Sequence, residues 1–355
     1  MKYGYSVEEH IIVTSDGRAL KVIRIPGNGP PVFLMHGLES SSDDWVTGPT
    51  DTNIPFLLSG RNFDVWLGNS RGIKNLKENE KIPKETFWDF SWHEIGMYDV
   101  PSMIDYILEK TNQKSLIYIG HSQGTTAFYV MCSLRPEYND KISLLISLSP
   151  VAWSSHMKSP ILQLLAPIRE ELYNFSTSHG VYDLFEGGTL LQFFHNAICG
   201  NIIAAEIVCK NFLYLFTGFS SHFPIRRMPV IFNHFPSPVS MKQIVHYLQL
   251  IKSGQFQQFD YGSQNILTYG SSEPPSYPVE NITAPVAIFF SDGDWLSSKS
   301  DVEILQSKLP NLVDIYEIPV KNYNHIDYLY HDKRNKILST IFSCFNRLSL
   351  YFFRV

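Results

Sequence analysis

The chain of 355 residues is long enough for one large α/β domain that carries an insertion, and 44% of its residues are hydrophobic, so it can bury a substantial core. Its formal net charge of −5 argues against a nucleic-acid partner, which would favour a basic face, and leaves any contact with a membrane surface to apolar side chains. The sequence contains no internal repeat and no apolar run long enough to serve as a transmembrane segment.

In chain order, the first half of the sequence predicts the strands of one sheet. Residues 8–25, with a Ser-Asp-Gly turn at 15–17, predict an opening hairpin. Four further apolar, β-prone segments follow at residues 31–35, 63–67, 115–119 and 142–148. From about residue 152 to 276 the sequence is rich in aromatic residues and predicts helices and irregular structure. Strand signals return at residues 284–290 and 313–318.

Residues 120–124 read GHSQG and match the pattern G-x-S-x-G between a predicted strand and a predicted helix. A serine on such a tight turn is held with its Oγ exposed, and the flanking glycines let neighbouring backbone approach. The helix N-terminus behind it favours developing negative charge. This context predicts that Ser122 is a nucleophile rather than a chance match to the pattern.

A serine nucleophile needs a base, and the base needs an acid that orients it. In the α/β-hydrolase arrangement these partners follow in the order Ser, Asp, His. The strand at 284–290 runs into the turn SDGDW, where Asp294 is the expected acid and Asp292 is its rival. The loop after the strand at 313–318 carries His325, which is the expected base.

Acyl transfer also needs two backbone N–H donors aimed at the oxyanion. One comes from the residue after the nucleophile, here Gln123, and the other from the loop after an earlier strand. The strand at 31–35 ends in His-Gly-Leu, so Leu38 is the expected second donor, and Gly37 lets the backbone turn.

Taken together, these motifs resemble the acid lipase family of α/β-hydrolases, which includes gastric lipase and lysosomal acid lipase. The matching stretches run almost from end to end, at residues 8–10, 14–17, 24–26, 36–38, 64–72, 90–94, 98–101, 120–126, 252–256, 259–262 and 323–327. Those at 64–72 and 120–126 are highly specific together.

Carried over residue by residue, the resemblance places the family's nucleophile on Ser122, its acid on Asp294 and its base on His325. Its oxyanion donors fall on Leu38 and Gln123. The chain departs from the family at the acid, where the usual Gly-Asn-Asp is replaced by Asp-Gly-Asp at residues 292–294. The second aspartate still matches, while the first adds a carboxylate that can shift the local electrostatics.

The resemblance implies an α/β-hydrolase fold: a mostly parallel central sheet flanked by helices, with an inserted, mainly helical cap and lid. The expected core has two parts, residues 1–151 and 279–355, around a cap at 152–278 whose lid spans about 187–219. The chain leaves the sheet after residue 122 and returns before 294, so we expect the cap to lie over the serine. The strongly apolar stretch at 190–219 fits either core helices under the cap or a lid that opens onto lipid, and the resemblance favours the lid.

Family members are secreted or lysosomal and carry a cleaved signal. Residues 1–5 lack the apolar core of a signal peptide, so we expect this chain to be a mature or truncated form of a secreted or lysosomal protein. Two N-x-S/T sequons, at Asn174 and Asn281, are candidate glycosylation sites and fit secretory passage.

The spacing of Cys199 and Cys209 resembles that of the family's single disulfide. Cys132 and Cys344 are expected to be buried free thiols. No pair of Cys or His residues has the spacing of a zinc site, so we expect no metal, and the acyl-enzyme chemistry needs no cofactor.

These features predict a lipase that acts on neutral-lipid esters at a lipid–water interface, with triacylglycerols as the first substrate class and cholesteryl esters as the second. A cap rich in Phe, Leu and Ile suits a long acyl chain, because each buried CH₂ contributes about 0.8 kcal/mol. Two alternatives are a soluble carboxylesterase on the same triad and a non-catalytic lipid-binding protein that kept the fold. The presence of all three triad members disfavours the second.

Overall fold

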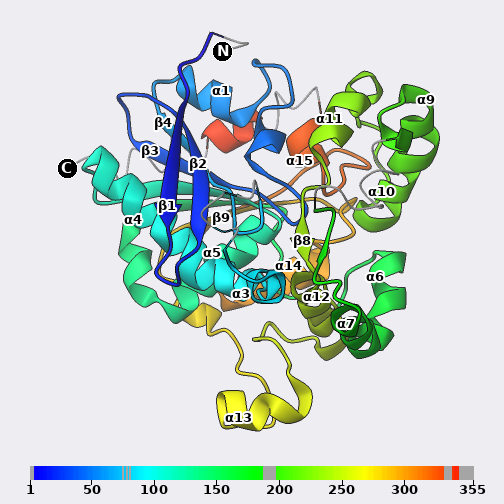
Figure 1. Cartoon of the computed structure of the whole chain (residues 1–355). Coiled ribbons are helices and arrows are strands. Elements are labelled where there is room, and N and C mark those ends of the chain that lie inside the picture. The colour runs from blue at the N-terminus through cyan, green and yellow to red at the C-terminus, as the bar shows by residue number, and fades with distance from the viewer. Residues whose placement is uncertain are drawn as a thin grey trace.

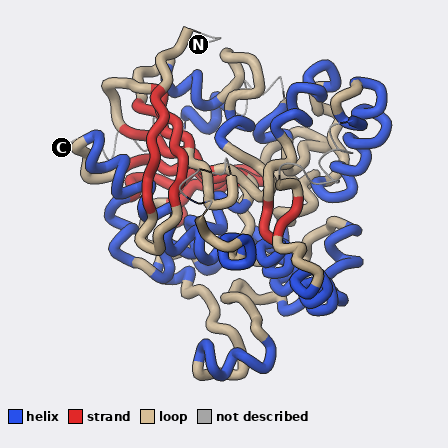
Figure 2. Tube along the Cα trace, in the orientation of Figure 1, coloured by secondary structure: helices blue, strands red, loops and turns tan. Residues whose placement is uncertain are grey.

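The structure is a computed structural model that describes residues 4–73, 76, 79, 81–186, 197–331 and 338–343. Its centre is an eight-stranded sheet in the order β1-β2-β4-β3-β5-β6-β9-β10 (Figures 1 and 2). The strands are β1 Glu8–Val13, β2 Ala19–Ile25, β3 Pro31–Met35, β4 Asp64–Leu67, β5 Leu116–His121, β6 Ile142–Leu148, β9 Val286–Phe290 and β10 Leu312–Glu317. Only β2 pairs antiparallel, with β1 and β4, so the sheet is mostly parallel as expected.

The central strands are largely apolar because both faces of the sheet are covered. All residues of β3, β5 and β9 are buried. Alternate residues enter two separate core clusters: Phe33 and Tyr118 pack in one, whereas Leu34 and Ile117 pack in the other. The strand period therefore divides the core into two layers, one on each side of the sheet.

Helices cover both faces of the sheet (Figure 1). Buried residues of α4, α5 and α14 belong to the first core cluster, and those of α1 and α15 belong to the second. Outside the long segment between β6 and β9, the described helices include α1 Ile54–Ser59, α2 Lys84–Trp88, α3 Trp92–Glu94, α4 Val100–Thr111, α5 Gln123–Leu134, α14 Lys299–Lys308 and α15 Asp327–Tyr330.

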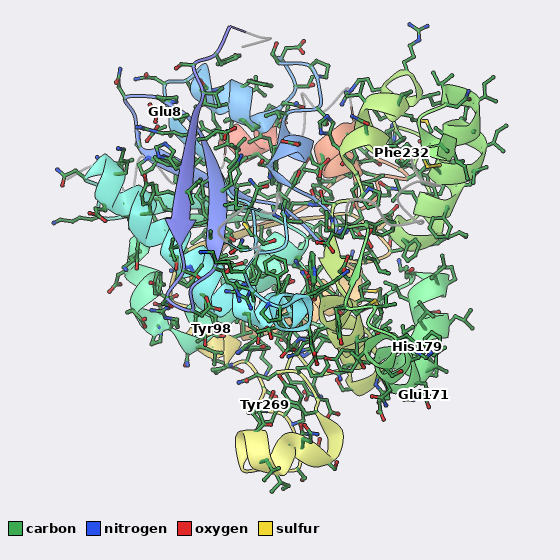
Figure 3. All side chains as sticks on the ribbon, in the orientation of Figure 1. Glu8, Tyr98, Glu171, His179, Phe232 and Tyr269 are labelled. Carbon is green, nitrogen blue, oxygen red and sulfur yellow. A yellow bond between two sulfur atoms is a disulfide. The ribbon has the colours of Figure 1, made fainter. Side chains whose placement is uncertain are left out.

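The segment between β6 and β9 is mainly helical. The helices described in it include α6 Pro160–Leu165, α7 Arg169–Ser178, α9 Ile202–Ala204, α10 Lys210–Thr217, α11 Met228–His234, α12 Met241–Ser253 and α13 Asn265–Tyr269. In Figure 1, α6, α7, α9 and α10 lie along one side of the molecule, and α13 projects at the bottom. Figure 3 labels Phe232 on α11, whose side chain packs in the second core cluster, and Tyr269 on the projecting α13.

This segment also contains a small sheet that the sequence did not predict, formed by β7 Asp183–Leu184 and β8 Val239–Ser240. Strands of two residues are too short to show an alternating pattern. The first part of the expected lid, residues 187–196, lies outside the described residues. Within the described ranges, no helix has the length and apolar character needed to cross a membrane.

Candidate active site

Ser122 occupies the turn between β5 and α5, at the carboxyl end of a central strand. Its backbone has φ 52° and ψ −121°, and its carbonyl oxygen accepts the Thr125 N–H at 2.8 Å, which starts the helix. As the first helical residue, Gln123 has an N–H without an acceptor inside the helix. The residue Ser122 is 8% exposed, so little of it reaches solvent.

Two glycines allow the close approach of backbone around this turn. A Cβ on Gly124 would lie 2.3 Å from the Met35 carbonyl oxygen, so only glycine lets α5 pack this closely on the end of β3. A Cβ on Gly37 would lie 3.0 Å from the Ser122 Cβ. The loop that carries Leu38 therefore lies directly beside the nucleophile turn.

His36 holds this loop in place through both ring nitrogens. Its Nε2 accepts the Ser70 N–H at 3.1 Å, so its Nδ1 carries the proton and donates to the Gly37 carbonyl oxygen at 2.8 Å. The His36 side chain thereby fixes the backbone just before Leu38, whose N–H was expected to bind the oxyanion.

Asp294 and His325 meet at the same sheet edge, after β9 and β10. The His325 Nδ1 lies 3.0 Å from each carboxylate oxygen of Asp294. The Asp294 side chain is fully buried, and its Oδ1 also accepts the N–H groups of Leu296 and Ser297 at 2.9 Å each. The sequence-predicted acid and base therefore form a buried, directly bonded pair.

Hydrogen bonds keep this buried carboxyl ionised. Burial acts to raise the pKa of Asp294, but the charge and hydrogen bond of His325, together with bonds from Ser149 and Ser297, hold that pKa below its usual value. Asp294 is therefore a carboxylate that can accept the His325 Nδ1–H and leave Nε2 as the basic nitrogen.

Ser149 is a contact of this pair that sequence reasoning missed. Its hydroxyl donates to Asp294 Oδ2, and its Oγ lies 2.6 Å from His325 Nδ1. No motif marks this serine in the sequence. The one available signal was its position immediately after the strand ending at Leu148, at the sheet edge where Ser122 and Asp294 also lie.

A second histidine packs behind the base. His121 Nε2 donates to the His325 carbonyl oxygen at 2.9 Å. Burial, and then the neighbouring His325, lower the pKa of His121 to about 3, so this ring is neutral. It supports the His325 backbone without adding a competing positive charge.

Asp292, the rival acid, is not part of this arrangement. Its side chain is 77% exposed and pairs with Lys158 at 3.2 Å. The structure therefore separates the two aspartates of the turn: one is buried against His325 and the other faces solvent.

The end of α10 contacts the loops of both Asp294 and His325. The Thr217 carbonyl oxygen accepts the Trp295 N–H at 3.3 Å and the His325 N–H at 3.4 Å, and Asn324 Nδ2 donates to the Gly218 carbonyl oxygen at 2.7 Å. These bonds tie the end of α10, in the middle of the inserted segment, to the site.

Two large apolar side chains of α10 reach solvent. Phe212 is 58% exposed and Leu215 is 46% exposed. Leu213, Tyr214 and Thr217 of α10 are buried, so one side of the helix packs against the rest of the molecule and another presents apolar groups to solvent.

The structure also shows the positions of three cysteines and of the two sequon asparagines. Cys199 and Cys209 form a disulfide with their Cα atoms 5.9 Å apart, as the resemblance implied, and Cys132 is a buried free thiol. Cys344 lies outside the described residues. The sequon residues Asn174, on α7, and Asn281, before β9, are both exposed.

Comparisons with known proteins agree on one family. A family model described as a partial alpha/beta-hydrolase lipase region matches residues 1–49, and one described as the alpha/beta hydrolase fold matches residues 30–177. The chain is 37% identical to gastric triacylglycerol lipase of Bos taurus over 92% of its own length and 85% of that protein. It is also 37% identical to Lipase 1 of Drosophila melanogaster, over 95% of its length and 76% of that protein.

Solved structures show the same fold at much lower identity. The alpha/beta hydrolase GrgF from Penicillium sp. sh18 superposes with a TM-score of 0.58 at 14% identity, covering 97% of this chain and 98% of the other. The sheet order, the motif matches and the full-length similarity to lipases all lead to one conclusion: the chain belongs to the acid lipase family of α/β-hydrolases.

Proposed function

We propose that this protein hydrolyses the carboxylic esters of neutral lipids through a Ser-His-Asp acyl-enzyme mechanism. The observation that carries the proposal is the buried pair of Asp294 and His325, bonded at 3.0 Å, at the sheet edge that also holds the strained turn of Ser122. An imidazole held this way can act as the general base for a neighbouring hydroxyl.

In the first half of the reaction, Ser122 Oγ attacks the ester carbonyl carbon while His325 Nε2 takes the hydroxyl proton. The C–O bond to the alcohol then breaks, and His325 returns the proton to the leaving alkoxide. In the second half, His325 deprotonates a water that attacks the acyl-enzyme, and the proton goes back to Ser122 as the fatty acid leaves.

The remaining groups act on charge and orientation. Asp294 fixes the His325 ring and stabilises its imidazolium form. The N–H groups of Leu38 and Gln123 are assigned to the oxyanion of both tetrahedral intermediates. The contact between the Gly37 loop and the Ser122 turn supports this assignment, because Leu38 directly follows Gly37 and Gln123 directly follows Ser122.

Triacylglycerols are the first proposed substrate class and cholesteryl esters the second. Similarity to gastric triacylglycerol lipase supports the first. We assign residues 152–278 as a cap, with a lid at about 187–219 that binds the lipid surface. The outward-facing apolar residues of α9 and α10 support this contact; they are Ile202, Ile203, Phe212 and Leu215.

We further propose that the protein is secreted or lysosomal and glycosylated at Asn174 and Asn281. Disulfides persist in oxidising compartments, so the Cys199–Cys209 bridge supports passage through the secretory pathway. The exposure of both sequon asparagines supports their use as acceptors.

Covalent labelling tests the mechanism. The wild-type protein should react with a fluorophosphonate probe and hydrolyse both a soluble short-chain ester and emulsified triacylglycerol. Ser122→Ala should abolish labelling and lower turnover by several orders of magnitude, because the residual activity comes only from binding and the oxyanion donors. Undiminished labelling of Ser122→Ala would remove the assignment of this residue as nucleophile.

A further inference from the structure

A third group, the hydroxyl of Ser149, contacts both members of the hydrogen-bonded pair of Asp294 and His325. Ser149 Oγ lies 2.6 Å from His325 Nδ1, whereas each carboxylate oxygen of Asp294 lies 3.0 Å from the same nitrogen. The nearest of these three oxygens to the imidazole Nδ1 therefore belongs to the serine and not to the acid.

The direction of the bonds follows from the donor inventory. An ionised carboxylate can only accept, so the Ser149 O–H donates to Asp294 Oδ2. The lone pairs of the same oxygen can then accept the proton on His325 Nδ1. Because a neutral imidazole has a single N–H, this arrangement leaves Nε2 unprotonated and ready to act as a base.

The two bonds of the hydroxyl reinforce each other. Donation to a carboxylate increases the negative charge on Ser149 Oγ, which makes that oxygen a better acceptor for the Nδ1–H. When His325 takes up a proton during the reaction, the developing positive charge is therefore stabilised by both the carboxylate and the polarised hydroxyl.

The backbone of Ser149 is unusual for a residue with a side chain. Its φ is 52°, in the left-handed region that favours glycine, and its N–H donates to the Phe289 carbonyl oxygen at 2.8 Å. The residue is fully buried. A glycine would adopt this backbone more easily, so the serine side chain carries a conformational penalty at the point where it contacts the acid and the base.

We propose that Ser149 is a positioning residue of the hydrolytic reaction, whose hydroxyl bridges Asp294 and His325 and holds the imidazole in the tautomer that activates Ser122. The inference rests on the proposed function, since it acts through the same acid and base. Ser149 acts only through these two side chains, so its loss should reduce the rate of the chemical step and leave substrate binding little changed.

Two substitutions separate the hydroxyl from the backbone. Ser149→Ala removes the hydroxyl and keeps the Cβ, whereas Ser149→Gly also relieves the backbone penalty. For a soluble short-chain ester, both variants should lose about tenfold or more in kcat with KM near the wild-type value, the size expected for losing a hydrogen bond to a charged group. Ser149→Gly should be at least as resistant to thermal unfolding as Ser149→Ala.

Ser147→Ala is the matched control. Ser147 is a fully buried serine in β6, two residues before Ser149, and its Oγ lies 2.7 Å from the Tyr129 hydroxyl. Its loss should affect stability while leaving kcat close to wild type. The downfield proton resonance of His325 Nδ1 gives a second readout: it should shift in Ser149→Ala and not in Ser147→Ala.

The outcomes are distinct. An active wild type with reduced kcat in both Ser149 variants and an altered Nδ1 resonance supports the inference. Wild-type kcat in Ser149→Gly, or in a folded Ser149→Ala, overturns it, and Ser149→Gly alone decides if the alanine variant does not fold. A wild-type protein that neither hydrolyses esters nor reacts with a fluorophosphonate instead overturns the proposed function.

Discussion

At the scale of single residues, position relative to the sheet decides what an ionisable group can do. Asp292 and Asp294 are two residues apart in one turn, yet only Asp294 is buried and bonded to His325. Asp292 faces water and pairs with Lys158. Solvent screens an exposed ion pair, whereas a buried carboxylate beside an imidazole interacts strongly with it.

We expect the two aspartates to respond very differently to the same substitution. Asp294→Asn should lower kcat by about 10³- to 10⁴-fold, because an amide can donate to Nδ1 and so favours the wrong imidazole tautomer. Asp292→Asn changes an exposed group and should leave kcat close to wild type. Steady-state kinetics on a soluble ester measure both. A larger loss in Asp292→Asn would show that the acid has been assigned to the wrong residue.

The predictable part of the site is the part with a local signature. Ser122 lies in a five-residue motif, and Asp294 and His325 follow apolar strands in the required order, so the sequence was enough to propose all three residues as candidates. Ser149 follows a strand too, but serine is common at strand ends and its partners come from segments distant in the chain. Its contacts arise only when β6, β9 and β10 lie side by side.

At the scale of elements, local sequence patterns predicted the strands of the main sheet, whereas parts of the inserted segment depend on packing between distant residues. Continuous apolar runs predicted β3 and β6 with the observed ends, because burial on both faces imposes them. The pairing of β7 with β8 depends on how the inserted helices pack and leaves no period in the sequence. The outward direction of Phe212 and Leu215 likewise depends on how the end of α10 is tied to the loops of the site.

The apolar outer side of α10 should matter for lipid and not for soluble substrates. Replacing Phe212 and Leu215 together by serine should weaken adsorption to emulsified triacylglycerol about tenfold, since two apolar groups would no longer enter the lipid surface. Hydrolysis of a soluble short-chain ester should be preserved, because neither side chain belongs to the proposed catalytic groups.

Val13→Ser is the control for the double substitution in α10. Val13 is 66% exposed on β1, which Figure 1 places on the opposite side of the molecule from α10. Its replacement should leave adsorption unchanged. Equal losses on emulsion and soluble ester in the α10 variant would mean that these residues support the fold, and the lid would no longer explain lipid contact.

At the scale of the whole molecule, two buried groups whose pKa values shift in opposite directions contribute to the pH dependence of stability. Burial lowers the pKa of His121 from 6.5 to about 3, so the folded protein resists its protonation. Burial raises the pKa of Asp44 from 3.8 to about 6, although bonds from Ser40 and Tyr330 act in the opposite direction. The folded protein therefore takes up a proton at Asp44 more readily than the unfolded chain does.

The two groups should change stability in opposite directions as the solution is acidified. The contribution of His121 is present above pH 6.5, the unfolded pKa, and is lost as pH falls towards the folded pKa. The contribution of Asp44 is fully present below pH 3.8, its unfolded pKa, and is lost as pH rises through about 6. Between pH 7 and 4, acid therefore weakens the fold through His121 and strengthens it through Asp44.

Single substitutions of His121 and Asp44 should reveal how each group changes the free energy of unfolding with pH. The free energy of unfolding of His121→Asn, relative to wild type, should increase as pH is lowered from 7 to 4, because the variant lacks the group that resists protonation. For Asp44→Asn the same difference should decrease over this range. Each slope is at most about 1.4 kcal/mol per pH unit, the value for one proton. Denaturant unfolding at pH 7, 6, 5 and 4 measures both, and parallel curves for the two variants would contradict the opposite pKa shifts that burial imposes.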